Sequence, residues 1–498
     1  MTSRYNHAAE KFVQIARIDH ALTFLQWDQL VKMPPQGNEA RARSLAELVS
    51  IRHQLLTEPE LAELLQAAGC EELTPAQRVS LEEMERQQRQ AICLPASLVK
   101  AQSLAGSTCE HGWRSQRKDN DWQGFLQNFV EVVRLSREEA RLRQETDPER
   151  FATPYDGLLD LYCSGDTSAF IHEVFVELKA ELPRLLQEVQ DRQQPAPDLA
   201  GSYPLTAQKA LSEKLMDCLG FDFSAGRLDV SMHPFSTGGR GDQRITTRFT
   251  ESAFLEPLLS TAHETGHASY EAGLPVEWDD LPVGRARNMC IHESQSLLFE
   301  KQLVLSRPFL QFFTPVIHAL LTDARQFDEE QIWQAAVTVR PGLIRTAADE
   351  VSYPLHVILR FEIESMLING EVEPADIPEL WDDRMQRYLG LRTVGNYRDG
   401  CLQDIHWTDG SFGYFPSYTI GALNAAQLFA AIRRAYPDWA TRLAEGEIGF
   451  LRQWLYEKIW SKGSSMASQD LIREATGETT SPRHFLAHIE ARYLNGSY

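Results

Sequence analysis

The most informative stretch of this chain begins with His263-Glu264-Thr265-Gly266-His267 and ends, twenty-six residues after His267, at Glu293. On an α-helix the two histidines lie one turn apart on one face, where both imidazoles can bind one divalent metal. Glu264 lies beside them, where its carboxylate can take a proton from metal-activated water. Chance alone produces such a pentad in about 3 in 100 chains of this composition. The arrangement is typical of zinc peptidases whose third ligand is a glutamate.

The third metal ligand has several candidates after the pentad. They are Glu271, Glu277, Asp279, Asp280, Glu293 and Glu300. Glu271 follows His267 by one turn, and the same helix does not easily bend it back to the same metal. Asp279 and Asp280 lie in a loop, where acids commonly form turns or caps. Glu293 opens a new apolar helix, and a carboxylate in such surroundings is costly unless it is paired or metal-bound. We therefore choose Glu293.

Composition limits the class of protein. The 498 residues are 43% hydrophobic and 24% charged, as in ordinary globular enzymes, and the net charge is −21. Such an acidic surface repels phosphate backbones and anionic lipids, so we expect neither a nucleic-acid nor a membrane-surface role. The seven cysteines show no CxxC spacing, and no run of eighteen apolar residues occurs. We expect a cytoplasmic protein with reduced thiols.

Helical periodicity dominates the chain. The spacing of apolar residues predicts helices at about 12–33, 40–56, 76–93, 121–145, 167–192, 289–305, 309–324, 328–337, 345–370, 376–391, 420–436 and 438–460. The helix that carries His263 is expected to be capped by Thr250 or Ser252 and to stop at Gly273 and Pro275. We expect a single catalytic domain over 1–498, with a helical part at about 1–220 and a metal-site and cleft part at about 221–498.

Two segments depart from helical periodicity. Residues 228–232 and 244–249 alternate apolar and polar side chains, and a turn-rich connector at 236–241 lies between them, which predicts a small antiparallel hairpin before the metal-site helix. Residues 396–418 are irregular and rich in glycine, aspartate and aromatic residues. Irregular loops on a rigid helical scaffold commonly carry function.

Six short motifs, in order along nearly the whole chain, are similar to those of one peptidase family. They are His233-Pro234-Phe235, Asp242-Gln243-Arg244-Ile245-Thr246, the His263–His267 pentad, His292-Glu293-Ser294-Gln295, Ile344-Arg345-Thr346-Ala347-Ala348-Asp349 and Gly400-Cys401-Leu402-Gln403-Asp404-Ile405-His406-Trp407. Trp27-Asp28-Gln29 and Met33-Pro34-Pro35 are also similar. The chain resembles the M32 metallocarboxypeptidases of the thermostable carboxypeptidase Taq type.

The resemblance implies a mainly α fold with two helical lobes flanking a deep active-site groove, related to angiotensin-converting enzyme and neurolysin. It implies removal of single C-terminal residues with broad specificity, poor action on C-terminal proline, and a homodimer. The implied cofactor is one Zn²⁺ per chain, for which Co²⁺ can substitute. The ligand assignment carries over as His263, His267 and Glu293, with Glu264 as base.

Substrate recognition requires a group that binds a free α-carboxylate, and arginine suits a bidentate contact. Arg345 is the first choice, although an ion pair with Asp349, one turn on, would make it structural. Arg244, beside Asp242, is the second choice. The alternative is that Arg244 forms an ion pair across strands at the surface.

Aromatic residues supply the other candidate roles. Tyr414, as a phenol, and His406, as an imidazolium, are the candidate catalytic donors to the developing oxyanion. By analogy with the converting-enzyme group, Tyr414 is expected to take this role, with His406 and Tyr418 lining the cleft. His233 is a candidate wall or supporting residue. His292 either orients a metal ligand by hydrogen bonding or is a core histidine.

Two competing functions remain at this stage. The same site would serve an oligoendopeptidase or a dipeptidyl carboxypeptidase, which differ in whether a free C-terminal carboxylate is required. A non-catalytic metal-binding scaffold is disfavoured because His263, Glu264, His267 and Glu293 are all intact.

Overall fold

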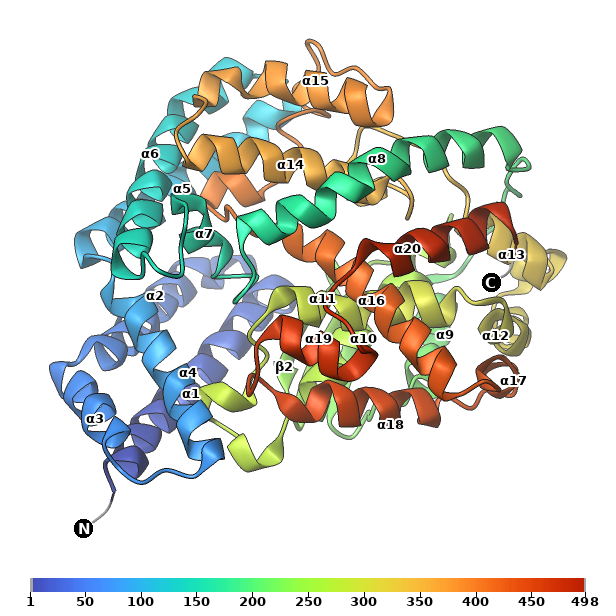
Figure 1. Ribbon diagram of the computed structural model, residues 1–498. Helices are drawn as coiled ribbons and strands as arrows, with labels where there is room; N and C mark the ends of the chain where they lie inside the picture. The colour runs from blue at the N-terminus through green and yellow to red at the C-terminus, as the bar shows by residue number, and fades with distance from the viewer. Residues whose placement is uncertain (1–2, 497–498) are drawn as a thin grey trace.

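The computed structural model describes residues 3–496, and helices make up most of it (Figure 1). The N-terminal helices form a bundle with a hydrophobic cluster of their own. They are α1 (Arg4–Val31), α2 (Asn38–Thr57), α3 (Pro59–Gly69) and α4 (Pro75–Ile92). Ser3 caps α1 by accepting from the amide of Asn6, and Thr74 and Gln77 form a capping box at the start of α4.

A larger hydrophobic cluster combines early and late parts of the chain. The helices around it are α5 (Ala96–Lys118), α6 (Trp122–Thr146), α7 (Pro154–Leu159), α8 (Ser168–Arg192), α14 (Tyr353–Ile368), α15 (Ile377–Leu389) and α20 (Pro482–Ile489). In Figure 1, α8 runs alongside α14 and α20, which come from distant parts of the sequence. This cluster supports the irregular segment before residue 416.

A second large cluster is built from the middle and end of the chain. Its helices are α9 (Leu205–Cys218), α10 (Leu255–Gly273), α11 (Met289–Leu297), α12 (Arg307–Leu320), α13 (Glu329–Ala336), α17 (Trp439–Ala444), α18 (Gly449–Lys458) and α19 (Ser468–Thr476). Helix α16 (Pro416–Ala435) contributes to both large clusters, with Leu423 in one and Leu428 in the other. The two clusters therefore meet along α16, and the predicted mainly α fold is confirmed.

The small sheet differs in part from the predicted hairpin. Its strands are β1 (Gly226–Val230), β2 (Phe235–Gly239) and β3 (Asp242–Thr247), in the order β1-β3-β2. The connector predicted at 236–241 is itself mostly strand β2, which pairs antiparallel with β3. The segments predicted to pair antiparallel, β1 and β3, instead run parallel, because the chain reverses before β2 and again at Gly241, which has a φ of 83°.

Several helix boundaries also differ. Helix α10 begins after Phe254, so neither Thr250 nor Ser252 caps it, while its predicted end at Gly273 is confirmed. The helix predicted at 438–460 is broken into α17 and α18, with Gly446 at a φ of 78° between them. The one predicted at 345–370 starts only at Tyr353, after a single 3₁₀ turn at Arg345–Ala347. Six helices, α3, α5, α7, α9, α19 and α20, lie where no helix was predicted.

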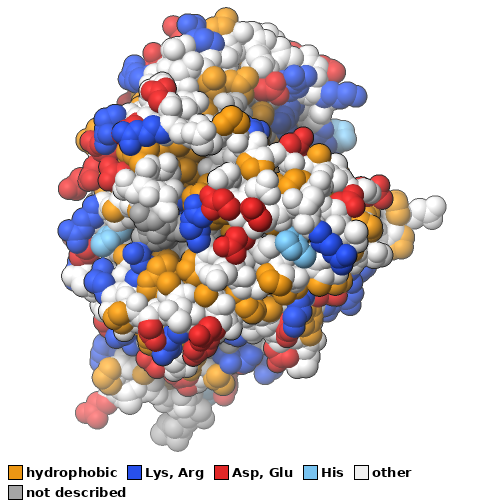
Figure 2. Space-filling model, turned by 90° about the vertical axis from the view of Figure 1, so that its right-hand side faces the viewer, with side chains coloured by type: hydrophobic (Ala, Val, Ile, Leu, Met, Phe, Trp, Pro, Cys, Tyr) orange, Lys and Arg blue, Asp and Glu red, His pale blue; other side chains and the backbone are white. Residues whose placement is uncertain are grey.

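Two surface properties complete the description. Figure 2 shows acidic, basic and hydrophobic side chains interspersed over the face that it presents. Within residues 3–496, no single helix has the length and apolar character to cross a membrane; one pair, Pro282–Val304 with Arg307–Leu320, meets the criterion jointly but is bent by 77°.

Candidate active site

The two histidines of the pentad and Glu293 converge in the structure. Helix α10 carries His263 and His267, and α11 carries Glu293. The Nε2 atoms of His263 and His267 lie 3.7 Å and 3.5 Å from the two carboxylate oxygens of Glu293. Ligands of a tetrahedral zinc ion, at about 2.1 Å from the metal, are about 3.4 Å apart. The three side chains, with ligand atoms within 4.8 Å of one another, therefore fit a divalent ion.

Two glycines allow the helices to approach this closely. A Cβ at Gly266 would lie 2.5 Å from the carbonyl oxygen of Gln295 on α11. A Cβ at Gly421 would lie 2.7 Å from the Cβ of Glu293, on the other side of α11. Both side chains would collide with backbone or with the ligand itself. Gly266 and Gly421 thus let α10 and α16 enclose the helix that carries Glu293.

The electrostatics of the cluster favour a cation. Burial disfavours a charged His263, but Glu293 and Glu300 outweigh it and raise its pKa to about 9. Burial lowers the pKa of His267 to about 4. Burial also raises the pKa of Glu264, which is 6% exposed, to about 7, against the opposing effect of His263. With both imidazoles in the neutral form that binds a metal, and with Glu300 paired with Lys301, the carboxylates of Glu264 and Glu293 leave a surplus of negative charge that a divalent ion would neutralise.

Each ligand histidine has a second polar partner behind it. The Nδ1 atom of His263 lies 2.9 Å from Glu300. The Nδ1 atom of His267 lies 2.6 Å from Nδ1 of His292, whose Nε2 lies 2.8 Å from Glu271. Glu271 and Glu300 had been considered only as metal ligands. In the structure they lie behind the histidines and not at the metal position. This placement depends on how α10 packs on α11, and the residue spacing within one segment does not reveal that packing.

A cavity of about 200 Å³ adjoins the cluster. Its lining includes His263, Glu293, Thr346 and Tyr353. Tyr353 accepts a hydrogen bond of 2.7 Å from Nη1 of Arg345, so the cavity reaches from the histidines toward that arginine.

Arg345 is buried, with 5% of its surface exposed, and its ion-pair partner is not Asp349. Its Nε and Nη2 atoms lie 3.0 Å and 2.9 Å from Asp404. Asp349 instead accepts backbone amides, among them that of Ser352. The predicted ion pair between Arg345 and Asp349 is therefore wrong. Arg345 lies in a 3₁₀ turn, whereas a pair at i,i+4 spacing requires both residues in one α-helix.

A second arginine shares the same carboxylate. Arg360 donates from Nε to the other oxygen of Asp404 at 2.7 Å. Burial opposes ionisation of Asp404, and the two guanidinium groups outweigh it and hold its pKa well below the usual range. Burial also lowers the pKa of Arg360, to about 10. Two guanidinium groups against one carboxylate leave an unbalanced positive charge beside Tyr353. Arg360 and Tyr353 were not singled out from the sequence.

The irregular segment brings its aromatic candidates together. The ring of Tyr414 lies 5.5 Å from His406 and 5.3 Å from Tyr418, and Tyr418 lies 3.3 Å from Nε2 of His406. Burial and the nearby Arg345 lower the pKa of His406 to about 4, so at neutral pH it is a neutral imidazole and not an imidazolium donor. Burial, with Glu293 next, raises the pKa of Tyr414 above its usual value, which keeps the phenol a proton donor.

The candidates on the sheet have other neighbours. Arg244 pairs with Asp242 at 2.7 Å, and its guanidinium lies 4.3 Å from the ring centre of Trp27 on α1. His233 is exposed. The pair is formed within β3, two residues apart, and not across strands, and the contact of Arg244 with Trp27 ties β3 to the N-terminal bundle.

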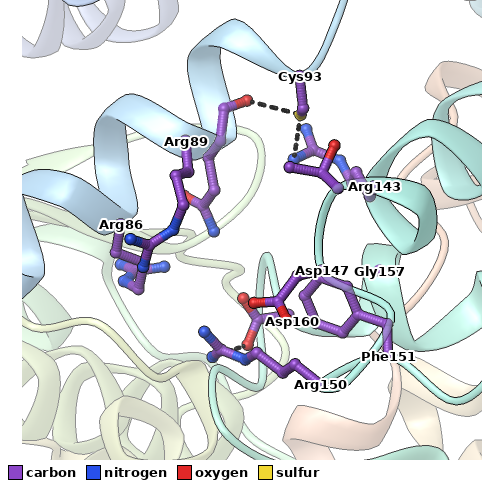
Figure 3. A pocket seen from close by; sticks show the side chains of 11 residues that line it. Arg86, Arg89, Cys93, Arg143, Asp147, Arg150, Phe151, Gly157 and Asp160 are labelled. Carbon is purple, nitrogen blue, oxygen red and sulfur yellow. Dashed lines mark hydrogen bonds and ion pairs between the residues drawn. The ribbon is translucent and has the colours of Figure 1, made fainter. Parts of the chain in front are cut away.

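A separate depression is lined by four arginines (Figure 3). They are Arg86, Arg89, Arg143 and Arg150. Each of them has an acidic neighbour close by: Glu83 for Arg86, Glu85 for Arg89, Glu139 for Arg143 and Asp160 for Arg150. We call this region the arginine depression. Its charges are balanced locally, unlike those around the histidines.

A mainly helical fold that places a two-histidine, one-glutamate cluster beside a buried glutamate defines a metallopeptidase. The family profile of carboxypeptidase Taq (M32) metallopeptidases matches residues 7–493. This chain belongs to the M32 family and is a metallocarboxypeptidase.

Relatives agree over almost the full length. Thermostable carboxypeptidase 1 of Thermus thermophilus is 36% identical, with 94% of each chain covered. The structure of Trypanosoma cruzi metallocarboxypeptidase 1 matches with a TM-score of 0.96 at 38% identity, covering 99% of both chains. A structure of Pyrococcus furiosus carboxypeptidase matches with a TM-score of 0.95 at 33% identity, again over 99% of both.

Proposed function

We propose that this enzyme hydrolyses the C-terminal peptide bond of peptides and releases single amino acids, with Glu264 as general base. The observation that carries the proposal is the arrangement of two opposite charge imbalances at one cavity. The carboxylate-rich histidine cluster lies at one side, and the surplus guanidinium charge of Arg345 and Arg360 lies behind Tyr353. A cation site and a carboxylate-binding site at one cavity suit the last residue of a peptide.

The metal ligands in this proposal are His263, His267 and Glu293. Two imidazole nitrogens and one carboxylate suit zinc, and the same donors accept cobalt. When bound, the ion polarises the scissile carbonyl and lowers the pKa of water. Glu264 takes the proton of the attacking water and passes it to the leaving amine, and burial keeps its basicity well matched to neutral pH.

Arg345 is proposed to bind the terminal carboxylate of the substrate, with Tyr353 and Tyr418 beside it. Its guanidinium lies 5.0 Å from the ring centre of Tyr418, which fixes its plane. Because Arg360 also neutralises Asp404, Arg345 can turn one edge to a substrate without leaving Asp404 unpaired. Arg244, with Asp242 and His233, remains the second choice for substrate contacts.

Tyr414 is proposed as the donor to the developing oxyanion. Its phenol stays protonated, and the charge of Glu293 acts on it, which supports a position near the ligands. His406, a neutral imidazole, is proposed to support it by lining the cleft with Tyr418.

Several finer properties rest on the family resemblance and belong to the same proposal. They are broad specificity with poor action on C-terminal proline, a homodimer, a cytoplasmic location and a single catalytic domain over 1–498. A deep groove between two lobes is proposed on the same ground.

The test compares peptides that differ only in a free or amidated C-terminus, incubated with zinc-loaded and chelator-treated enzyme. Mass spectrometry should detect successive losses of one residue from the free acids alone, abolished by the chelator. Cleavage of amidated peptides, or removal of dipeptides, would favour the oligoendopeptidase or dipeptidyl carboxypeptidase alternative. Zinc binding without any cleavage would favour the alternative of a non-catalytic metal-binding scaffold.

A further inference from the structure

The segment that follows Glu293 carries a second carboxylate, that of Glu300, which lies behind the ligand His263. Helix α11 passes into a π-helical turn, η4 (Leu298–Val304), which contains Glu300. Glu300 contacts His263 on α10, so it faces the same helix as Glu293 does. Turns of this type occur frequently at functional sites, where they shift side chains out of the α-helical register.

Glu300 meets the ring of His263 on the side away from Glu293. Its Oε2 lies 2.9 Å from Nδ1 of His263, while Nε2 of the same ring faces Glu293. A hydrogen bond from Nδ1–H to a carboxylate leaves the lone pair on Nε2, which is the form that binds a metal. The contact therefore fixes both the orientation and the tautomer of His263.

Glu300 is in turn held by Lys301, its neighbour in the π-turn. The Nζ atom of Lys301 lies 2.6 Å from Oε1 of Glu300, so each oxygen of this carboxylate has its own partner. Glu300 is only 13% exposed at its side chain, and an unpaired carboxylate so placed would be costly. Lys301 thus keeps Glu300 ionised and stationary.

The C-terminal end of the chain closes this arrangement. Arg492 lies in the π-helical turn η10 (Glu490–Leu494) and is 1% exposed. It donates from Nη2 to the carbonyl oxygen of Lys301 at 2.7 Å and from Nη1 to Glu350 at 2.9 Å. Tyr493 also donates to Glu350, at 2.9 Å. The backbone of the π-turn is therefore anchored by a residue 191 positions later in the sequence.

We infer that Glu300 is a positioning residue for the metal ligand His263, and that the C-terminal turn, through Arg492 and the backbone of Lys301, holds Glu300 in place. The buried groups balance in charge, two carboxylates against Lys301 and Arg492, so the network can remain ionised away from water. The inference rests on the proposed metal site. It adds that the affinity for the metal depends on Arg492 in the C-terminal turn.

The test measures zinc affinity by competition with a chromogenic chelator. Glu300→Ala should weaken zinc binding by about 10–100-fold, the usual effect of losing a group that orients a metal ligand. Glu300→Gln, which keeps an acceptor for Nδ1–H, should lose less. Arg492→Met should weaken binding by a smaller factor in the same direction. In the double variant, Arg492→Met should add little to Glu300→Ala, because it acts through Glu300.

A matched control separates positioning from general stability. Glu83 is a buried glutamate that pairs with Arg86 and Arg287, and Glu83→Ala removes a comparable ion pair on α4. Its zinc affinity should remain at the wild-type value. The absorption spectrum of the Co²⁺-loaded enzyme gives a second readout, which should change for Glu300→Ala and not for Glu83→Ala. If Arg492→Met folds poorly, Arg492→Lys replaces it in the comparison of the single and double variants.

The outcomes are distinct. Wild-type enzyme that does not bind zinc would overturn the proposed metal site and this inference together. Tight wild-type binding with equal affinity for Glu300→Ala and Glu83→Ala would overturn the inference alone. Additive losses in the double variant would show that Arg492 acts by another route and would overturn the link to the C-terminus.

Discussion

The metal-site cavity and the arginine depression contrast two ways of placing charged residues at a hollow. In the depression, Arg86, Arg143 and Arg150 each have an acidic partner nearby, and the charges balance locally. Around His263 and Arg345 the charges are buried and unbalanced, negative at one side and positive at the other. Unbalanced buried charge is costly without a ligand, so its presence distinguishes a binding site from a network of locally paired charges.

The contrast predicts its largest effect at Glu264. Glu264→Gln preserves shape and removes the base, so kcat should fall by about 100–10,000-fold, the range for loss of a general base. Zinc affinity, measured in parallel, should stay near the wild-type value because Glu264 is not a ligand in our proposal. Retention of full turnover by this variant would refute the mechanism.

The next effect is expected at Arg345. Arg345→Met should lower kcat/KM for free-acid peptides by about 100–1,000-fold, since a charged hydrogen-bond partner of the substrate is lost. Asp404 keeps Arg360, so the variant should fold. Arg143→Met, which removes a similarly buried arginine from the arginine depression, is the control and should leave kcat/KM within about twofold. Equal losses in both variants would remove the distinction between the two regions.

A pH effect on stability is expected from Glu364, which lies beneath the irregular segment. It accepts hydrogen bonds from Tyr155, Trp407 and the amide of Gly413, and burial raises its pKa to about 7. The folded protein therefore holds a proton that the unfolded chain releases near pH 4.5, and this stabilisation is lost as pH rises from there through about 7. The expected loss is about 3 kcal/mol.

Denaturation of wild type and Glu364→Gln at pH 5 and pH 8 measures this contribution. The glutamine does not titrate, so the decrease in stability between the two pH values should be smaller in the variant. An identical decrease in both proteins would show that Glu364 is already ionised at pH 5.

The smallest effect is expected in the arginine depression itself. Arg150 is 34% exposed at its side chain, and its pair with Asp160 is partly screened by water. Arg150→Met should change the free energy of unfolding by about 0–1 kcal/mol and kcat by less than twofold. A large loss of activity would show that this depression is coupled to the catalytic region and that the two regions do not differ in function as we propose.

Prediction from the sequence worked best where one segment supplies the information. The pentad places two histidines on one helical face, and Gly273 and Pro275 end that helix as expected. The strands at 228–232 and 244–249 were recognised, but their parallel pairing was not, because alternation does not specify direction. Arg345 was singled out as the residue that binds the substrate carboxylate, and that role stays a prediction; its ion-pair partner Asp404 lies 59 residues away and not one turn on.

The sequence alone established the helical class and the family to which the chain belongs, and it selected His263, His267 and Glu293, which the structure brings together. These follow from short-range periodicity and from motifs whose spacing is fixed along the chain. Only the tertiary structure decided that Glu300 stands behind His263, that Arg360 shares Asp404, and that Arg492 anchors the turn beside the metal site. Such contacts join segments far apart in the sequence, so tertiary packing sets them and not local propensity.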